Sequence, residues 1–125
     1  MEAGQASGLK MCYAGFNKGR IALMAATLAA AESFGVRDVI HQQWELRGEA
    51  TRATAERLVA GNAPKAWRWA AEMREISETF SATGLPGDFH EGAAKVYEML
   101  SAFKDHEGVT LDQVLRTMLD RAAKA

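Results

Sequence analysis

The sequence predicts an all-α protein of about six helices, the first of which is unusually long. Apolar residues recur at helical spacing along the whole chain, and the period-two alternation of β-branched and aromatic residues that marks a strand is hard to find. The length of 125 residues fits one domain, 1–125, and leaves no room for a second domain of ordinary size. We therefore expect a single helical domain with one core.

The first helix is predicted over residues 7–34, with Gly35 as its natural stop, and it would be about 40 Å long. Small residues recur along it at spacings of three and four and form a stripe on one face: Gly15, Gly19, Ala22, Ala26 and Ala30. Such a stripe allows another helix, in this subunit or in a second one, to approach closely.

Two shorter helices are expected next. The second is marked by apolar residues at helical spacing and ends near Gly48: Val36, Val39, Ile40 and Trp44. The third covers residues 50–60, has a weaker apolar face, and ends at Gly61-Asn62.

The last three helices have clearer start and stop signals. The fourth is expected to have Pro64 in its first turn and to end at Gly84-Leu85-Pro86, and its core face is Trp69, Met73, Ile76 and Phe80. The fifth starts at a capping box of Asp88 and Glu91, ends before Gly108, and has the core face Phe89, Ala93, Val96, Tyr97, Leu100 and Phe103. The sixth starts at a capping box of Thr110 and Gln113, and its buried stripe is Leu111, Val114, Leu115, Met118 and Leu119.

Composition excludes several classes of partner. Fifteen basic and sixteen acidic residues give a formal charge of -1 without a basic block, so we expect no nucleic-acid partner. The longest uncharged run, residues 21–31, is too short to span a bilayer, and the chain start lacks the layout of a signal peptide. A single cysteine, Cys12, and three widely separated histidines predict no disulfide and no metal site. We therefore expect a soluble, cytoplasmic protein.

The densest polar constellation lies in the first helix. Lys10, Tyr13 and Asn17 fall at i, i+3 and i+7, share one helical face, and could converge on one ligand. A lysine acts as a general acid or base only when burial or a neighbouring cation lowers its pKa from about 10.4. Lys18 lies on a different face and is a weak candidate for that cation. Judged by spacing alone, Lys10 is typical of a solvated lysine at the start of a helix.

Two ordered stretches resemble a known family. The first is Gly8-Leu9-Lys10-Met11-Cys12-Tyr13-Ala14 followed by Lys18-Gly19. The second is Ala63-Pro64-Lys65-Ala66-Trp67-Arg68-Trp69, with Glu72-Met73, Glu75-Ile76 and Gly84-Leu85-Pro86 after it. Together they resemble the helical C-terminal domain of 6-phosphogluconate-dehydrogenase-like proteins. These belong to the β-hydroxyacid dehydrogenase superfamily, which includes 6-phosphogluconate and 3-hydroxyisobutyrate dehydrogenases. The resemblance covers nearly the whole chain.

The resemblance implies a substrate and dimerisation domain that a long helix joins to a Rossmann cofactor domain. It implies that Lys10 is the catalytic acid/base for a small hydroxy acid, with NAD(P) as the cofactor of the complete enzyme. The superfamily often places an asparagine three or four residues after this lysine, where this sequence has Tyr13 and Ala14. Tyr13 or Asn17 would then bind the substrate. A lysine-aspartate motif of the superfamily corresponds loosely to Arg74-Glu75, so Arg74 either binds a substrate carboxylate or phosphate or forms an ion pair.

The cofactor domain is missing from these 125 residues. No G-x-G-x-x-G turn between a strand and a helix is present, so we expect this chain alone to bind no NAD(P) and to be inactive by itself. The expected role is that of the C-terminal piece of a homodimeric dehydrogenase. The alternative is a stand-alone helical homodimerisation or interaction module without catalysis, in which the small-residue stripe carries the function.

Overall fold

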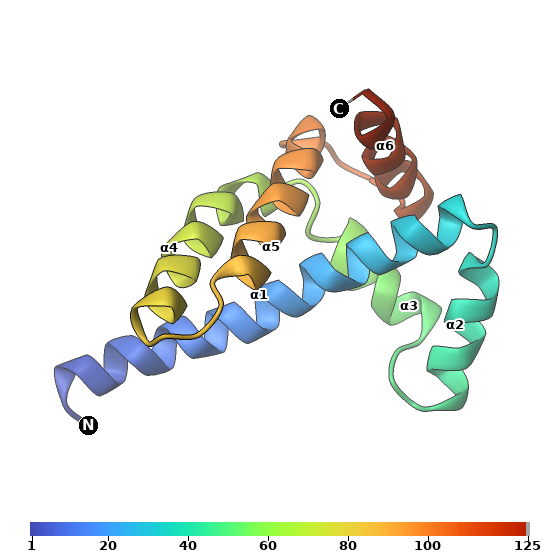
Figure 1. The fold of residues 1–125 in the computed structure, drawn as a ribbon. Helices are drawn as coiled ribbons and strands as arrows, with labels where there is room; N and C mark the ends of the chain where they lie inside the picture. Colours follow the sequence, from blue (N-terminus) through green and yellow to red (C-terminus); the bar gives the residue numbers. More distant parts are fainter. Residues whose placement is uncertain (125) are drawn as a thin grey trace.

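The computed structural model describes residues 1–124 and confirms the all-α prediction. Six α-helices, one π-helical turn and two 3-10 turns follow one another along the chain, and this part of the chain contains no strand (Figure 1). In order they are α1 (Ala3–Ser33), α2 (Arg37–Leu46), α3 (Arg52–Ala55), η1 (Glu56–Ala60), η2 (Ala66–Arg68), α4 (Trp69–Ala82), α5 (Asp88–Met99), η3 (Leu100–Phe103) and α6 (Leu111–Lys124).

Helix α1 organises the whole molecule. It has 31 residues, so it is about 46 Å long. The backbone N–H of Glu2 donates to the Gln5 side chain at 3.1 Å, and the helix consequently begins four residues before the predicted start. Figure 1 shows the antiparallel pair α4–α5 against the first half of α1, and α2, α3 and α6 around its second half. None of the helices in residues 1–124 is both long and apolar enough to cross a membrane.

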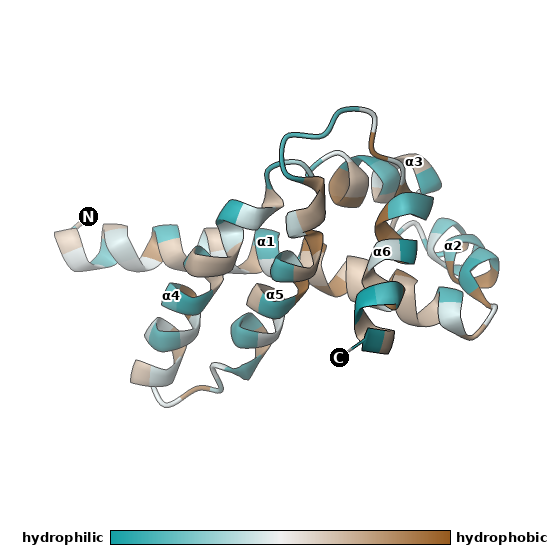
Figure 2. Cartoon of the chain, turned by 90° about the horizontal axis from the view of Figure 1, so that it is seen from above, coloured by the Kyte–Doolittle hydropathy of each residue, from teal (hydrophilic) through white to brown (hydrophobic). Residues whose placement is uncertain are grey.

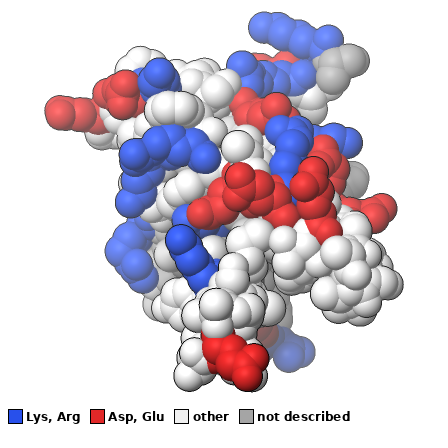
Figure 3. Space-filling view, turned by 90° about the vertical axis from the view of Figure 1, so that its left-hand side faces the viewer, with Lys and Arg blue, Asp and Glu red and all other residues white. Residues whose placement is uncertain are grey.

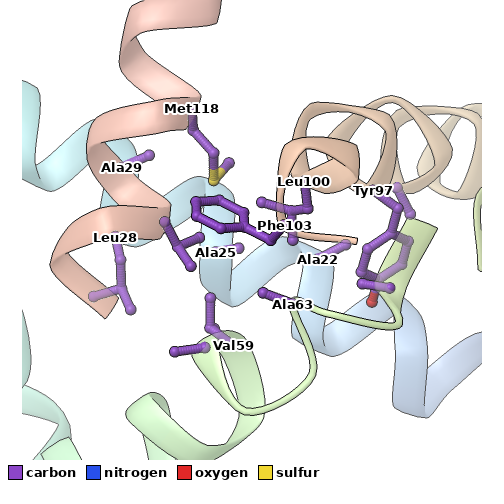
Figure 4. Close-up of a cluster of buried hydrophobic side chains, with 14 of the residues drawn as sticks. Ala22, Ala25, Leu28, Ala29, Val59, Ala63, Tyr97, Leu100, Phe103 and Met118 are labelled. Atoms are coloured by element: carbon purple, nitrogen blue, oxygen red, sulfur yellow. The ribbon is translucent and has the colours of Figure 1, made fainter. Parts of the chain in front are cut away.

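The core lies where the second half of α1 meets the later elements. Alanines dominate the α1 side, which lets larger residues of η1, α5, η3 and α6 approach the helix closely (Figure 4). The buried members that Figure 4 labels are Ala22, Ala25, Leu28, Ala29, Val59, Ala63, Tyr97, Leu100, Phe103 and Met118. Figure 2 shows the hydrophobic segments near this centre and hydrophilic residues towards the outer helices.

The predicted start of the fourth helix was wrong. Residues 61–65 form turns, η2 follows, and α4 begins only at Trp69, so Pro64 is not in its first turn. The carbonyl oxygen of Pro64 accepts the backbone N–H of Asp105 at 3.1 Å, in the loop after η3. In a helix, the Pro64 carbonyl oxygen would accept a hydrogen bond from a backbone N–H of the following turn. Here the N–H of Asp105 takes that place.

The capping box predicted for Asp88 and Glu91 does not form. Gly87 is the N-cap, Asp88 is already the first helical residue, and the Glu91 carboxylate accepts instead from Arg74 of α4. Gly87 is buried at the α4–α5 turn, where an added Cβ would lie 2.5 Å from Ser81 Oγ and 2.7 Å from the Ser77 carbonyl oxygen. Only glycine fits this N-cap without displacing α4.

Phe89 was also placed wrongly, since its side chain is 76% exposed. His90, the next residue, takes the inward position of the first α5 turn instead. By contrast, the capping box of Thr110 and Gln113 is confirmed: the Thr110 N–H donates to Gln113 Oε1 at 2.9 Å, and the Gln113 N–H donates to Thr110 Oγ1 at 3.2 Å.

Candidate functional site

The polar face predicted on the first helix lies in the amino-terminal half of α1. Lys10 and Tyr13 are exposed, Tyr13 at 71%, and Asn17 is half-buried. Among residues 1–124 no side-chain hydrogen bond or ion pair engages these three groups. Their polar atoms therefore remain available to a ligand or to a covering domain. The desolvation that a catalytic lysine needs is not provided by the described residues.

Arg74 lies on α4 and not on α1. Its guanidinium donates to Glu98 at 2.8 Å and to Glu91 at 3.3 Å, and both carboxylates belong to α5. The hydrogen bond from Arg74 lowers the pKa of Glu98 and raises the pKa of Arg74 itself. The ion-pair interpretation of Arg74 is thus confirmed, with partners across the α4–α5 contact and not along α4. Its role in substrate binding stays a prediction.

Lys18 connects α1 with α4. Its ammonium donates to Glu72 Oε1 at 2.6 Å and lies 5.0 Å from the centre of the Trp69 ring. The Trp69 ring in turn packs edge-on against Tyr97 of α5, at 5.3 Å between ring centres. Lys18 is therefore engaged in helix packing, and Trp69 is part of the same contact. Trp67 contacts Lys104 instead, with the ammonium 4.4 Å from its ring.

An apolar groove runs between α1 and α5, beside the Lys10 face. We call it the α1–α5 groove; it has a volume of about 770 Å³ and is lined mainly by Gly15, Phe16, Gly19, Leu23, Phe89 and Val96. Three of its rim side chains are largely in solvent: Phe16 at 73%, Leu23 at 69% and Phe89 at 76%. Large apolar surfaces of this kind mark interaction sites in soluble proteins. Helical spacing predicts the small-residue stripe of α1, part of which lines the groove, but not this rim of bulky apolar side chains.

His90 forms the end of the groove floor. Its Nε2 lies 2.9 Å from the Gly15 carbonyl oxygen, and its ring packs edge-on against Phe80 at 4.7 Å between centres. An added Cβ at Gly15 or at Gly19 would lie 3.2 Å from His90 Nε2. Gly15 and Gly19, the first two small residues of the stripe, therefore make room for the His90 ring. Ala26, further along the stripe, lines the groove wall.

Basic and acidic side chains both occur on the side of the molecule from which α1 starts (Figure 3). No group of three or more potential metal ligands is found within residues 1–124. His41 and His90 are buried on different helices, and His106 is exposed in the loop before α6.

A comparison with protein families connects this geometry with known sequences. The family described as Domain of unknown function (DUF1932) matches residues 31–100, which is more than half of the chain. The chain belongs to the DUF1932 family. Searches of curated proteins and of solved structures found no significant match.

The DUF1932 match extends from the last turn of α1 to the start of η3. It includes Arg74, the α4–α5 pair and the second of the two motifs, Ala63 to Trp69. It does not include Lys10, Tyr13 or Asn17, which precede it on the same continuous helix. Their chemistry therefore rests on the first motif and on the geometry of α1.

Proposed function

We propose that this chain is the C-terminal substrate-pocket and dimerisation domain of an NAD(P)-dependent oxidoreductase of the 6-phosphogluconate/β-hydroxyacid dehydrogenase type. The observation that carries the proposal is the unengaged polar face of Lys10, Tyr13 and Asn17 on the exposed half of a long helix. Membership in the DUF1932 family supports it, because the matched stretch includes the second motif on which the resemblance rests.

In this proposal Lys10 acts as the general acid/base. Its Nζ would accept the proton of the substrate hydroxyl during oxidation and return it during reduction. Tyr13 and Asn17, one and two turns further on, would orient the substrate through a hydroxyl and an amide. An attached domain that covers this face would remove water from Lys10 and make proton transfer near neutral pH possible.

In this proposal the cofactor is bound outside the described residues. Residues 1–124 form no strand and contain no glycine-rich turn that could hold a pyrophosphate. NAD(P) is therefore assigned to another domain of the complete enzyme, and a small hydroxy acid is the proposed substrate.

The experiment is to read the DNA upstream of the Met1 codon and to express the whole reading frame. We expect a Rossmann domain in frame, and reduction of NAD⁺ or NADP⁺, followed at 340 nm, with at least one member of a panel of small and phosphorylated hydroxy acids. The 125-residue chain alone, as the control, should reduce neither cofactor. A reading frame without a cofactor domain would contradict the proposal.

The α1–α5 groove favours homodimerisation, both within this proposal and in the alternative of a non-catalytic module. One patch presents bulky side chains, Phe16, Leu23 and Phe89, next to small ones, Gly19 and Ala26. A two-fold axis brings such a patch onto itself, so that the bulky groups of one copy enter the groove of the other. The three rim side chains are about two-thirds to three-quarters exposed, so a second copy could cover them. They would form part of the roughly 800 Å² that each partner buries in a stable dimer.

A further inference from the structure

Helix α2 lies at the edge of the molecule, and a glycine with a positive φ lies just beyond each of its ends. Gly35 and Gly48 flank it with φ of 73° and 71°, in the left-handed region that glycine adopts at little cost. Figure 1 shows α2 at the carboxyl-terminal end of α1, far from the α4–α5 pair. Ile40 and Trp44 are half-buried, and His41 is the one α2 side chain that is fully buried.

The way in which His41 is buried is unusual for a histidine. The residue is 1% exposed, and neither ring nitrogen has a hydrogen-bond partner. Its ring packs edge-on against Trp44 at 6.1 Å between centres. A neutral imidazole tolerates such a site at a cost, whereas a protonated ring would bury a charge and two N–H donors without an acceptor.

The charged neighbours do not compensate for this burial. Arg52 at the start of α3 and Arg37 on α2 face His41 and oppose a positive ring, whereas Asp38 and Glu45 on α2 favour it. Arg52, however, already engages both carboxylates: its guanidinium donates to Asp38 at 2.9 Å, and its backbone N–H donates to Glu45 at 3.2 Å. Burial first, and Arg52 second, lower the pKa of His41 below its usual 6.5.

We propose that α2 is a pH-released latch, which is docked by the neutral ring of His41 and turns away about Gly35 and Gly48 when that ring is protonated. Release uncovers the apolar end of α1 against which α2 packs. The latch does not depend on the catalytic proposal, because it involves none of the residues of the Lys10 face.

Ion pairs also hold α2 against its neighbours. Arg37 donates to Asp112 of α6 at 2.6 Å and to Glu32 of α1 at 3.5 Å, and Arg52 holds Asp38. The hydrogen bond from Arg52 lowers the pKa of Asp38 below its usual value, so Asp38 keeps its charge at pH 5. Protonation of His41 in this range therefore leaves the Arg52–Asp38 ion pair in place.

The sign of the pH dependence follows from the lowered pKa of His41. The docked ring binds its proton less tightly than the released ring, whose pKa is about 6.5. Docking is therefore strongest above about pH 6.5. Below it the opening equilibrium constant rises by up to about tenfold per pH unit, until the pKa of the docked ring is reached.

The test is hydrogen exchange of residues 37–46 in the full 125-residue chain at pH 7.5 and pH 5.0, corrected for the intrinsic exchange rate. We expect protection in α2 to fall by about tenfold at pH 5.0 while α4 and α5 keep theirs. His41→Phe keeps an aromatic ring without a titrating group and should remain protected at pH 5.0. His106→Phe, which changes the exposed histidine before α6, should behave like the wild type.

Unchanged protection of α2, an equal loss in all helices, or the same loss in His41→Phe would each overturn the latch. If His41→Phe fails to fold, an NMR titration of the His41 ring in the wild type decides the question. A ring pKa at or above 6.5 in the folded protein would contradict the latch, and a pKa clearly below 6.5 would support it.

Discussion

Tyr97 joins the core to α1 through one polar atom. It is fully buried in the cluster of Figure 4. Its hydroxyl donates to the Lys18 carbonyl oxygen, and burial raises the pKa of the phenol. The ring packs against Trp69, which also contacts the Lys18 ammonium. Tyr97 of α5 thus contacts both α1 and α4 and adds to the direct Lys18–Glu72 link between those two helices.

Removing the Tyr97 hydroxyl should therefore weaken the fold without opening a large cavity. We expect Tyr97→Phe to lower the free energy of unfolding by about 1 to 2 kcal/mol, because a buried hydrogen bond is lost while the ring remains. Urea denaturation measures the change. Tyr13→Phe is the matched control on the exposed face of α1 and should stay within about 0.5 kcal/mol of the wild type. Equal effects of the two substitutions would contradict the role of the Tyr97 hydroxyl.

For single residues, the sequence predicts most core positions, but not always which of two adjacent residues is buried. Tyr97, Ala93, Leu100 and Phe103 are buried as helical spacing indicates, whereas Phe89 is exposed and His90 is buried. Hydrophobicity favours Phe89 over His90 for the core. His90 is nevertheless the buried residue because of Gly15 on α1, which lies 75 positions earlier in the chain. The Gly15 carbonyl oxygen accepts a hydrogen bond from the His90 ring, and the absence of a side chain at Gly15 leaves room for that ring.

At the scale of an element, the start of α6 is fixed by local and distant contacts. Thr110 and Gln113 cap each other reciprocally, and the Leu111 N–H donates to Glu56 of η1 at 3.1 Å. Two backbone N–H groups of the first turn of α6 therefore have side-chain partners, one in the adjoining Thr110 and one in Glu56 of η1.

We expect Thr110→Ala to lower the free energy of unfolding by about 1 kcal/mol, because the N-cap side chain that accepts the Gln113 N–H is lost. Thr117→Ala, in the middle of the same helix, is the matched control and should change stability by no more than about 0.5 kcal/mol. Thermal and urea unfolding both measure this difference. Indistinguishable stabilities of wild type and Thr110→Ala would show that the cap contributes nothing.

Helix boundaries were predictable where the signal is local and failed where it is not. The α6 cap lies within four residues and follows from the sequence. The start of α4 depends on the bond between Pro64 and Asp105, which are 41 positions apart, and the start of α5 depends on the contacts of Gly87 with α4. A proline near a helix start is a local signal, and the distant bond overrides it.

At the scale of the whole molecule, the α1–α5 groove is an apolar surface that the described residues leave open. We expect the wild type to dimerise and Ala26→Leu to raise the dissociation constant at least tenfold, because the added side chain fills the groove wall. Ala30→Leu, on the same stripe but exposed and outside the groove lining, is the matched control and should leave the dissociation constant unchanged. Sedimentation equilibrium measures both. An Ala26→Leu variant that dimerises like the wild type would remove this groove from the interface.

The candidate site was only partly predictable for a related reason. Positions i, i+3 and i+7 of one helix share a face, so Lys10, Tyr13 and Asn17 are brought together by α1 alone. Arg74 lies on another helix, and its direction depends on Glu91 and Glu98 of α5, whose register with α4 no local pattern specifies.

The most direct test of the proposed function is the turnover of the complete protein, cofactor domain included, with Lys10→Ala. We predict that kcat falls by about 10² to 10⁴-fold with little change in KM, because general acid/base catalysis is lost while substrate contacts remain. Lys95→Ala, which removes an exposed lysine of α5, is the matched control and should retain wild-type turnover. A Lys10→Ala enzyme whose kcat stays within about threefold of the wild type would contradict the assignment of Lys10 as the acid/base.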